Sequence, residues 1–195
     1  GRQAVALLET TGEWHWLGLA YWDVGLSAIY LGAFDTAREA LAHTRSLGEA
    51  HEDKRLLHFA DIHLGVIHML HGEWDMGIEV YQRVLASGPD PVTALVAQMH
   101  LGYAYLEQGQ LDQAIPLLTH VVQQCQKAQL RGPQSRMATF LAQALLLNKC
   151  IESAQRMAQQ ALHIGQLLSY PYGVALAQRA LGRIAQAQGD DATAA

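Results

Sequence analysis

A small residue recurs at intervals of about 40 residues, and this repeat constrains the fold more than any other feature of the sequence. It occupies five positions: Gly25, Gly65, Gly102, Ala142 and Gly182. In four of the five copies a glycine follows seven residues later, and another small residue comes five residues after that place. Because five copies agree in phase, the sequence predicts an array of similar units in which each unit packs on its neighbours.

Each copy predicts two helices joined by a short turn. Apolar residues recur at helical spacing up to the turn, and the second helix opens with an apolar residue followed by an acid, as in Phe34-Asp35 and Trp74-Asp75. An acid in the first turn is favourable because it faces the positive end of the helix dipole. The expected helices cover residues 14–31, 34–48, 52–71, 74–87, 91–108, 111–128, 133–148, 151–168 and 173–188, with a further start at 191 and an earlier helix ending near residue 9.

The pattern resembles the tetratricopeptide repeat (TPR) family, whose signature runs Trp-x2-Leu-Gly-x2-Tyr, then Ala-x3-Phe, then Pro. The third copy matches best, with Leu101, Gly102, Tyr105 and Ala114 in place, whereas the fourth has Lys149 instead of the turn glycine. Units of about 40 residues exceed the usual 34. They are similar to those of kinesin light chains and of the sensor regions of bacterial LuxR-type regulators. HEAT and armadillo units approach this length, but the phase of the small residues argues against them.

The resemblance implies an all-α fold, a right-handed α-solenoid of about five TPR-like helix-turn-helix units. We expect residues 1–195 to form a single array with units at roughly 18–57, 58–94, 95–134, 135–174 and 175–195, the last of them truncated. The chain begins with Gly1 and ends inside an expected helix, which favours a fragment of a longer protein.

In the TPR family the first helix of each unit lines the concave face, and ligand contacts concentrate at the second, fifth, ninth and twelfth places. The resemblance implies a groove that is apolar at first and cationic later. The apolar candidates are Trp22, Leu26, Ile29, Phe59, Ile62, Val66, Met69, Met99 and Tyr103. The cationic candidates are Arg136, Arg179 and Arg183. Guanidinium groups in a groove can bind a carboxylate or phosphate through two hydrogen bonds.

Two arrangements of these side chains are compatible with the sequence. The apolar residues either face a partner or pack in the core, and the arginines either bind an anion or are ordinary exposed charges. The groove arrangement predicts that Trp22→Ala or Tyr103→Ala weakens partner capture and leaves thermal unfolding nearly unchanged. The Lys and Asn with which co-chaperone TPR proteins bind a terminal carboxylate are not found at the fifth and ninth places of the first three units.

Composition and charge narrow the function further. The chain is 50% hydrophobic and 16% charged, and it has no apolar run of the ~20 residues that a membrane crossing needs. Two cysteines are too few for a disulfide framework, so we expect a cytoplasmic protein. Residues 1–112 carry a net charge of −9 and residues 113–195 a net charge of +4. This polarity favours an acidic partner at the basic end, or a homodimer.

No catalytic, cofactor or metal site is predicted. The chain has no GxxxxGK[ST] or GxGxxG motif and no set of nucleophile, base and acid. His58, His63, His68 and His71, with Asp61 nearby, lack the spacing of a four-ligand site. The basic half is too sparse for nucleic-acid binding.

The sequence therefore favours a non-catalytic scaffold that binds a peptide, a partner helix or another segment of its own protein in the groove. The alternative is the ligand-sensing region of a multidomain bacterial signalling ATPase, transcription regulator or nucleotide cyclase, with a small-molecule effector.

Overall fold

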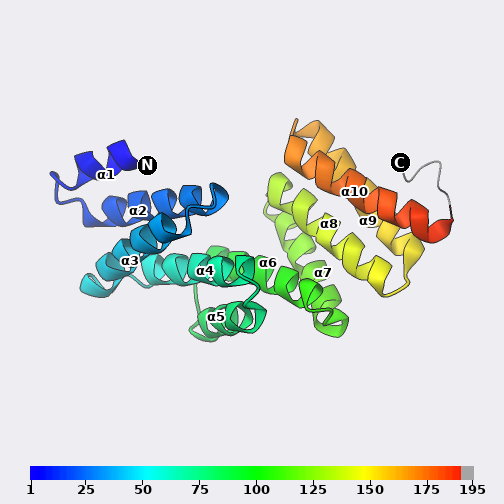
Figure 1. Ribbon diagram of the computed structural model, residues 1–195, viewed down its shortest axis with the longest axis horizontal. Coiled ribbons are helices and arrows are strands. Elements are labelled where there is room, and N and C mark those ends of the chain that lie inside the picture. The colour runs from blue at the N-terminus through cyan, green and yellow to red at the C-terminus, as the bar shows by residue number, and fades with distance from the viewer. Residues whose placement is uncertain (190–195) are drawn as a thin grey trace. The chain divides into compact units, whose positions relative to one another are not determined.

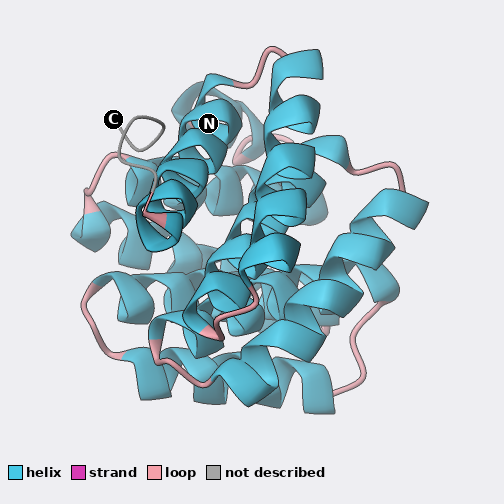
Figure 2. Cartoon of the chain, turned by 90° about the vertical axis from the view of Figure 1, so that its right-hand side faces the viewer, coloured by secondary structure: helices cyan, strands magenta, loops and turns pink. Residues whose placement is uncertain are grey.

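The computed structural model describes residues 1–189, which form ten helices and no strand (Figures 1 and 2). The helices are α1 (Arg2–Leu8), α2 (Trp14–Tyr30), α3 (Phe34–Ala50), α4 (Lys54–Leu70), α5 (Trp74–Ala86), α6 (Pro91–Glu107), α7 (Leu111–Lys127), α8 (Arg131–Leu147), α9 (Ile151–Leu167) and α10 (Pro171–Gln188). We call α2, α4, α6, α8 and α10 first helices and α3, α5, α7 and α9 second helices, because each first helix precedes the turn of a hairpin. None of the described helices is long and apolar enough to cross a membrane.

The predicted helices agree with the observed ones to within two residues at each end. α4 begins two residues late because Asp53 caps it, accepting hydrogen bonds from the backbone N–H groups of Arg55 and Leu56. α8 begins two residues early, since Pro133 is tolerated in the first turn, where backbone N–H groups have no partner inside the helix. The start predicted at residue 191 lies outside the described residues.

Every turn contains one residue in the left-handed region, with φ between 49° and 80°. Inside the hairpins, and at the end of α10, these residues are Gly32, Gly72, Gly109, Lys149 and Gly189. Before each first helix they are Gly12, Glu52, Gly88, Gln129 and Ser169. The fourth hairpin therefore makes the same turn as the others without a glycine, which explains why the spacing of the repeat is unchanged there.

Lys149→Gly should raise the free energy of unfolding by about 0.5–1 kcal/mol, because only glycine adopts this conformation without a steric cost from Cβ. Urea unfolding followed by circular dichroism would measure the change. Lys149→Ala is the control, since alanine keeps the Cβ. An equal gain from both substitutions would mean that the lost charge, and not the backbone, is responsible.

The repeating small residues lie where first and second helices of one hairpin touch. Each of three glycines faces a side chain 16 residues later, in the pairs Gly25–Leu41, Gly65–Tyr81 and Gly102–Leu118. Ala142 and Ala158 have the same spacing and belong to one core cluster. A Cβ at Gly65 would lie 2.8 Å from Cε1 of Tyr81, so glycine makes room for the large partner. Where the first residue is alanine the second is alanine as well. These positions are therefore equivalent, as the sequence predicts.

The chain divides into two compact units, Gly1–Leu101 (unit 1) and Gly102–Ala195 (unit 2), and α6 spans the boundary. The core of unit 1 includes Ala28, Ile29, Ala37, Leu41 and Ile67. The core of unit 2 includes Ala142, Ala154, Ala158, Ala180 and Ile184. Small side chains thus let the helices of unit 2 approach closely. The expected single array stays a prediction.

Candidate functional site

The predicted aromatic residues of unit 1 lie together on two neighbouring first helices. Trp22 of α2 stacks on Phe59 of α4, with ring centroids 5.0 Å apart, and Arg55 lies 5.3 Å above the Phe59 ring. The indole N–H of Trp22 donates a hydrogen bond of 3.0 Å to Nδ1 of His63. Trp22 and Val66 are half-buried and also pack against the core of unit 1.

His63 is a central contact of this group that the sequence did not indicate. Burial lowers the pKa of His63 below its ordinary value, so the ring is neutral. Its Nδ1 also lies 2.8 Å from the carbonyl oxygen of Phe59. Nδ1 cannot accept from Trp22 and donate to this carbonyl at once, so the bond from Trp22 requires the tautomer with the proton on Nε2. The position of His63 in the sequence could have indicated this contact, because His63 follows Trp22 by one repeat and one residue.

Burial separates the predicted groove residues of unit 1 into two sets. Ile29, Ile62, Met69 and Met99 are buried and belong to the core between helices. Leu26, like Trp22, Phe59 and Val66, is only half-buried and keeps part of its surface free. We call Trp22, Leu26, Phe59 and Val66 the unit 1 face.

In unit 2, Tyr103 of α6 stacks on Phe140 of α8, with centroids 4.5 Å apart. Burial raises the pKa of Tyr103 to about 12, helped by the charge of Glu107 and a hydrogen bond with it. Arg179 of α10 opposes this shift, so its positive charge lies close enough to act on the Tyr103 hydroxyl. Three first helices therefore bring an aromatic pair and a guanidinium group together.

The three candidate arginines differ in their surroundings. Arg136 is half-buried, and its charge acts on Cys125, where burial raises the pKa of the thiol and Arg136 opposes the rise. Arg179 and Arg183 are exposed, and neither pairs with a carboxylate of the described residues. Because they are four residues apart on α10, they share one side of that helix. We call Tyr103, Phe140, Arg179 and Arg183 the unit 2 face.

The sequence did not indicate Phe140, Glu107 or the state of Gln143. Phe140 lies one turn before Gln143, which is the place in α8 equivalent to Tyr103, so a search one turn either side of the family's contact places would have found it. The side-chain Nε2 of Gln143 is buried and has no hydrogen-bond partner among the described residues.

The histidines considered as metal ligands each lie within hydrogen-bond distance of another protein group. Nδ1 of His68 lies 2.6 Å from a carboxylate oxygen of Glu73, and Nε2 of His58 lies 2.9 Å from the Ser87 hydroxyl. Nδ1 of His71 lies 2.8 Å from the carbonyl oxygen of Ile67. The described residues hold no group of three or more His, Cys, Asp or Glu that could bind a metal ion.

Comparison with known proteins bears on the fold of the chain. The Tetratricopeptide repeat family matches residues 96–127, which cover most of the third predicted unit. No curated protein sequence matches the chain.

Several solved structures share the fold. BtubC from P. vanneervenii is 18% identical with a TM-score of 0.70, over 98% of this chain and 76% of that one. The nearly identical TPR-like repeats of a Podosopora anserina protein assigned as a kinesin light chain are 21% identical with a TM-score of 0.68, over 90% and 88%. MamA from Desulfovibrio magneticus RS-1 is 19% identical with a TM-score of 0.59, over 91% and 88%.

At these identities the similar structures show the fold alone, an all-α, TPR-like solenoid fold. The family match falls on the copy that carries the signature residues best, and the paired small residues show that the other hairpins are built in the same way. Residues 96–127 thus match a tetratricopeptide repeat, and the described part of the chain has a TPR-like solenoid fold.

Proposed function

We propose that the chain is a non-catalytic binding module whose first helices hold an acidic peptide or protein segment, with the unit 2 face as the principal contact. The observation that carries the proposal is the pair of exposed arginines, Arg179 and Arg183, which have no carboxylate partner in the described residues. Arg179 lies close enough to the stacked rings of Tyr103 and Phe140 to act on the Tyr103 hydroxyl.

The chemistry of the unit 2 face fits a partner with carboxylate and apolar side chains. A guanidinium group donates two hydrogen bonds to one carboxylate, and the half-buried rings offer apolar area next to it. Burial of that area would supply about 25 cal/mol per Å2, while the arginines would set the orientation of the partner. Glu107 lies on the same side near Tyr103, so it limits how closely a carboxylate approaches that hydroxyl.

The double substitution of Arg179 and Arg183 by alanine should weaken binding of a fluorescein-labelled peptide of alternating Glu and Leu about tenfold, which corresponds to about 1.4 kcal/mol. Fluorescence polarisation would measure the affinity between about 0.05 and 0.3 M salt, and the variant should show a flatter salt dependence.

The matched control replaces Lys149 and Arg156 by alanine. Both are exposed cations of unit 2, but Lys149 lies at a turn and Arg156 lies on the second helix α9. This control lowers the net charge by the same amount. If both pairs of substitutions weaken binding equally, the peptide is attracted by net charge only and the proposed site is wrong.

Cytoplasmic location, self-association through the oppositely charged halves and a ligand-sensing role in a bacterial regulator stay predictions of the sequence. We propose the binding module ahead of the sensor, because the unit 2 face combines free charge with half-buried aromatic surface.

A further inference from the structure

A stretch of acidic and exposed apolar side chains begins at the turn of the second hairpin. Residues 70–82, which we call the acidic segment, contain no lysine or arginine and three exposed acids, Glu73, Asp75 and Glu79. Leu70 is 56% exposed and Met76 is 51% exposed. Because Asp75 and Glu79 are four residues apart on α5, they share one side of that helix. The acidic segment therefore offers carboxylate groups and apolar surface together.

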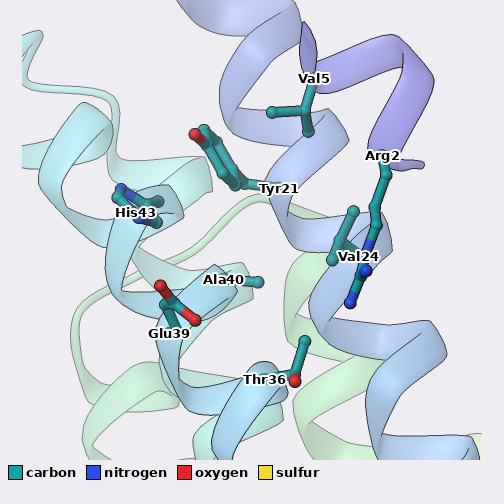
Figure 3. Close-up of a pocket in the computed structure, with 8 residues that line it drawn as sticks. All are labelled: Arg2, Val5, Tyr21, Val24, Thr36, Glu39, Ala40 and His43. Carbon is teal, nitrogen blue, oxygen red and sulfur yellow. The ribbon is translucent and has the colours of Figure 1, made fainter.

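The equivalent acids of α3, Asp35 and Glu39, have cations beside them. The exposed Arg38 lies between them in the sequence. Glu39 also lines a pocket of about 290 Å3 among α1, α2 and α3, and the side chain of Arg2 lines the same pocket (Figure 3). Over its first two turns, α5 is thus the more strongly acidic of the two helices.

The unit 2 face presents the complementary groups. Arg179 and Arg183 are exposed, share one side of α10 at the same four-residue spacing, and pair with no carboxylate of the described residues. Tyr172 of α10 is 56% exposed. Burial is the main cause of the raised pKa of Tyr103, and the charge of Tyr172 adds to it, so the two hydroxyl groups lie close together. The ring of Tyr172 therefore adjoins the unit 2 face and adds exposed aromatic surface.

The net charge of the two parts of the chain has the same sense as these local groups. Residues 1–112, which include all of unit 1, carry a net charge of −9, and residues 113–195 carry a net charge of +4. Two copies of the chain therefore attract each other when unit 1 of one approaches unit 2 of the other, and like units repel.

We infer that the acidic segment of a second copy of the chain binds to the unit 2 face. The two carboxylates of α5 in one copy accept hydrogen bonds from the two arginines of α10 in the other, because both pairs have the same spacing. Met76 packs its thioether on the ring of Tyr172. This inference rests on the proposed function, since it names the acidic protein segment that the unit 2 face holds.

Sedimentation velocity of the whole chain tests for self-association at protein concentrations from about 1 to 500 μM. At about 0.05 M salt we expect reversible association with a Kd on the order of 10 μM. At about 0.3 M salt the association should be at least tenfold weaker, because salt screens the exposed charges. A chain that stays monomeric at the highest concentration in low salt would overturn the inference.

Two charge-reversal variants test the contact itself. Arg179→Glu with Arg183→Glu, and separately Asp75→Lys with Glu79→Lys, should each weaken self-association at least about tenfold. An equimolar mixture of the two variants should associate again, because each reversed helix then meets its opposite charge. Circular dichroism checks that each variant is folded, and Glu79→Lys alone takes the place of the second variant if loss of Asp75 unfolds the chain. A mixture that stays monomeric would show that these helices do not meet.

The matched control is Asp35→Lys with Glu39→Lys, which changes the net charge equally at the equivalent places of α3. We expect it to associate within about twofold of the parent chain. A loss as large as that of the α5 variant would mean that net charge alone brings the copies together, and the assigned contact would be wrong.

The labelled peptide of alternating Glu and Leu separates this inference from the proposed function. The peptide should compete with self-association, since both use Arg179 and Arg183. If the chain binds the peptide and never self-associates, the second copy is wrong as the partner and the binding module stands. If it does neither, both proposals fail.

Discussion

Gly65→Ala should lower the free energy of unfolding of the chain by about 2 kcal/mol, although alanine is the better helix former. The added Cβ would lie 2.8 Å from Cε1, 2.9 Å from Cζ and 3.0 Å from the hydroxyl of Tyr81, whose side chain is fully buried. A ring held on all sides cannot move away without disturbing α4 and α5, so the strain remains in the folded state. Urea unfolding would measure the loss.

Gly132→Ala is the matched control, because Gly132 also lies in a helix but has open space where its Cβ would be. That variant should be as stable as the parent or slightly more stable. If Gly65→Ala unfolds at the same urea concentration as Gly132→Ala, close contact between paired helices is not what selects glycine at this position.

Trp22→Ala should lower the free energy of unfolding by about 3 kcal/mol, and not leave it nearly unchanged as a purely partner-facing side chain would. The substitution removes the stacking on Phe59 and the packing against the core of unit 1, and it leaves Nδ1 of His63 without a donor. Thermal or urea unfolding would measure the loss.

Trp22→Phe is the control for the indole hydrogen bond, since it keeps an aromatic ring and loses the N–H. It should recover most of the packing and still lack about 1 kcal/mol. Equal stability of Trp22→Phe and the parent would show that the bond to His63 contributes nothing.

The stability contributed by the contact between Trp22 and His63 should depend on pH. Because burial lowers the pKa of His63, the unfolded chain binds the proton more readily than the folded chain between the folded pKa and about 6.5. Stability should therefore fall as the pH is lowered through that window, by up to about 1.4 kcal/mol per pH unit. Protonated Nδ1 donates to the Phe59 carbonyl and can no longer accept from Trp22. His63→Gln should flatten the slope, whereas replacement of the exposed His120 by Gln should not.

The sequence predicted the helices and turns well because the repeat reports them several times. Five copies in phase place each hairpin, and an unusual turn residue such as Lys149 changes the local energy without changing the register. The acids expected in the first turn of second helices are found there, at Asp35, Asp75, Asp112 and Glu152.

Side-chain burial was harder to predict than helix position. Ile62 and Trp22 both occupy the fifth place of their repeats, yet Ile62 is fully buried and Trp22 is half-buried. The family's contact places specify a direction on one helix, but burial depends on the size of side chains from the neighbouring helices. Trp22 and His63 belong to neighbouring repeats of the array, so a pattern defined within one repeat cannot predict the hydrogen bond between them.

The matched pairs across each hairpin limit how such a chain can be rearranged by duplication or recombination. Gly65 leaves room for Tyr81, whereas the equivalent places of the fourth hairpin hold Ala142 and Ala158, two members of one core cluster, so side chains of complementary size are carried by a whole hairpin. A crossover between two hairpins keeps each pair together, whereas a crossover inside a hairpin would place a tyrosine or leucine against an alanine. Inherited changes in the number of units should therefore begin and end at the turns that precede first helices.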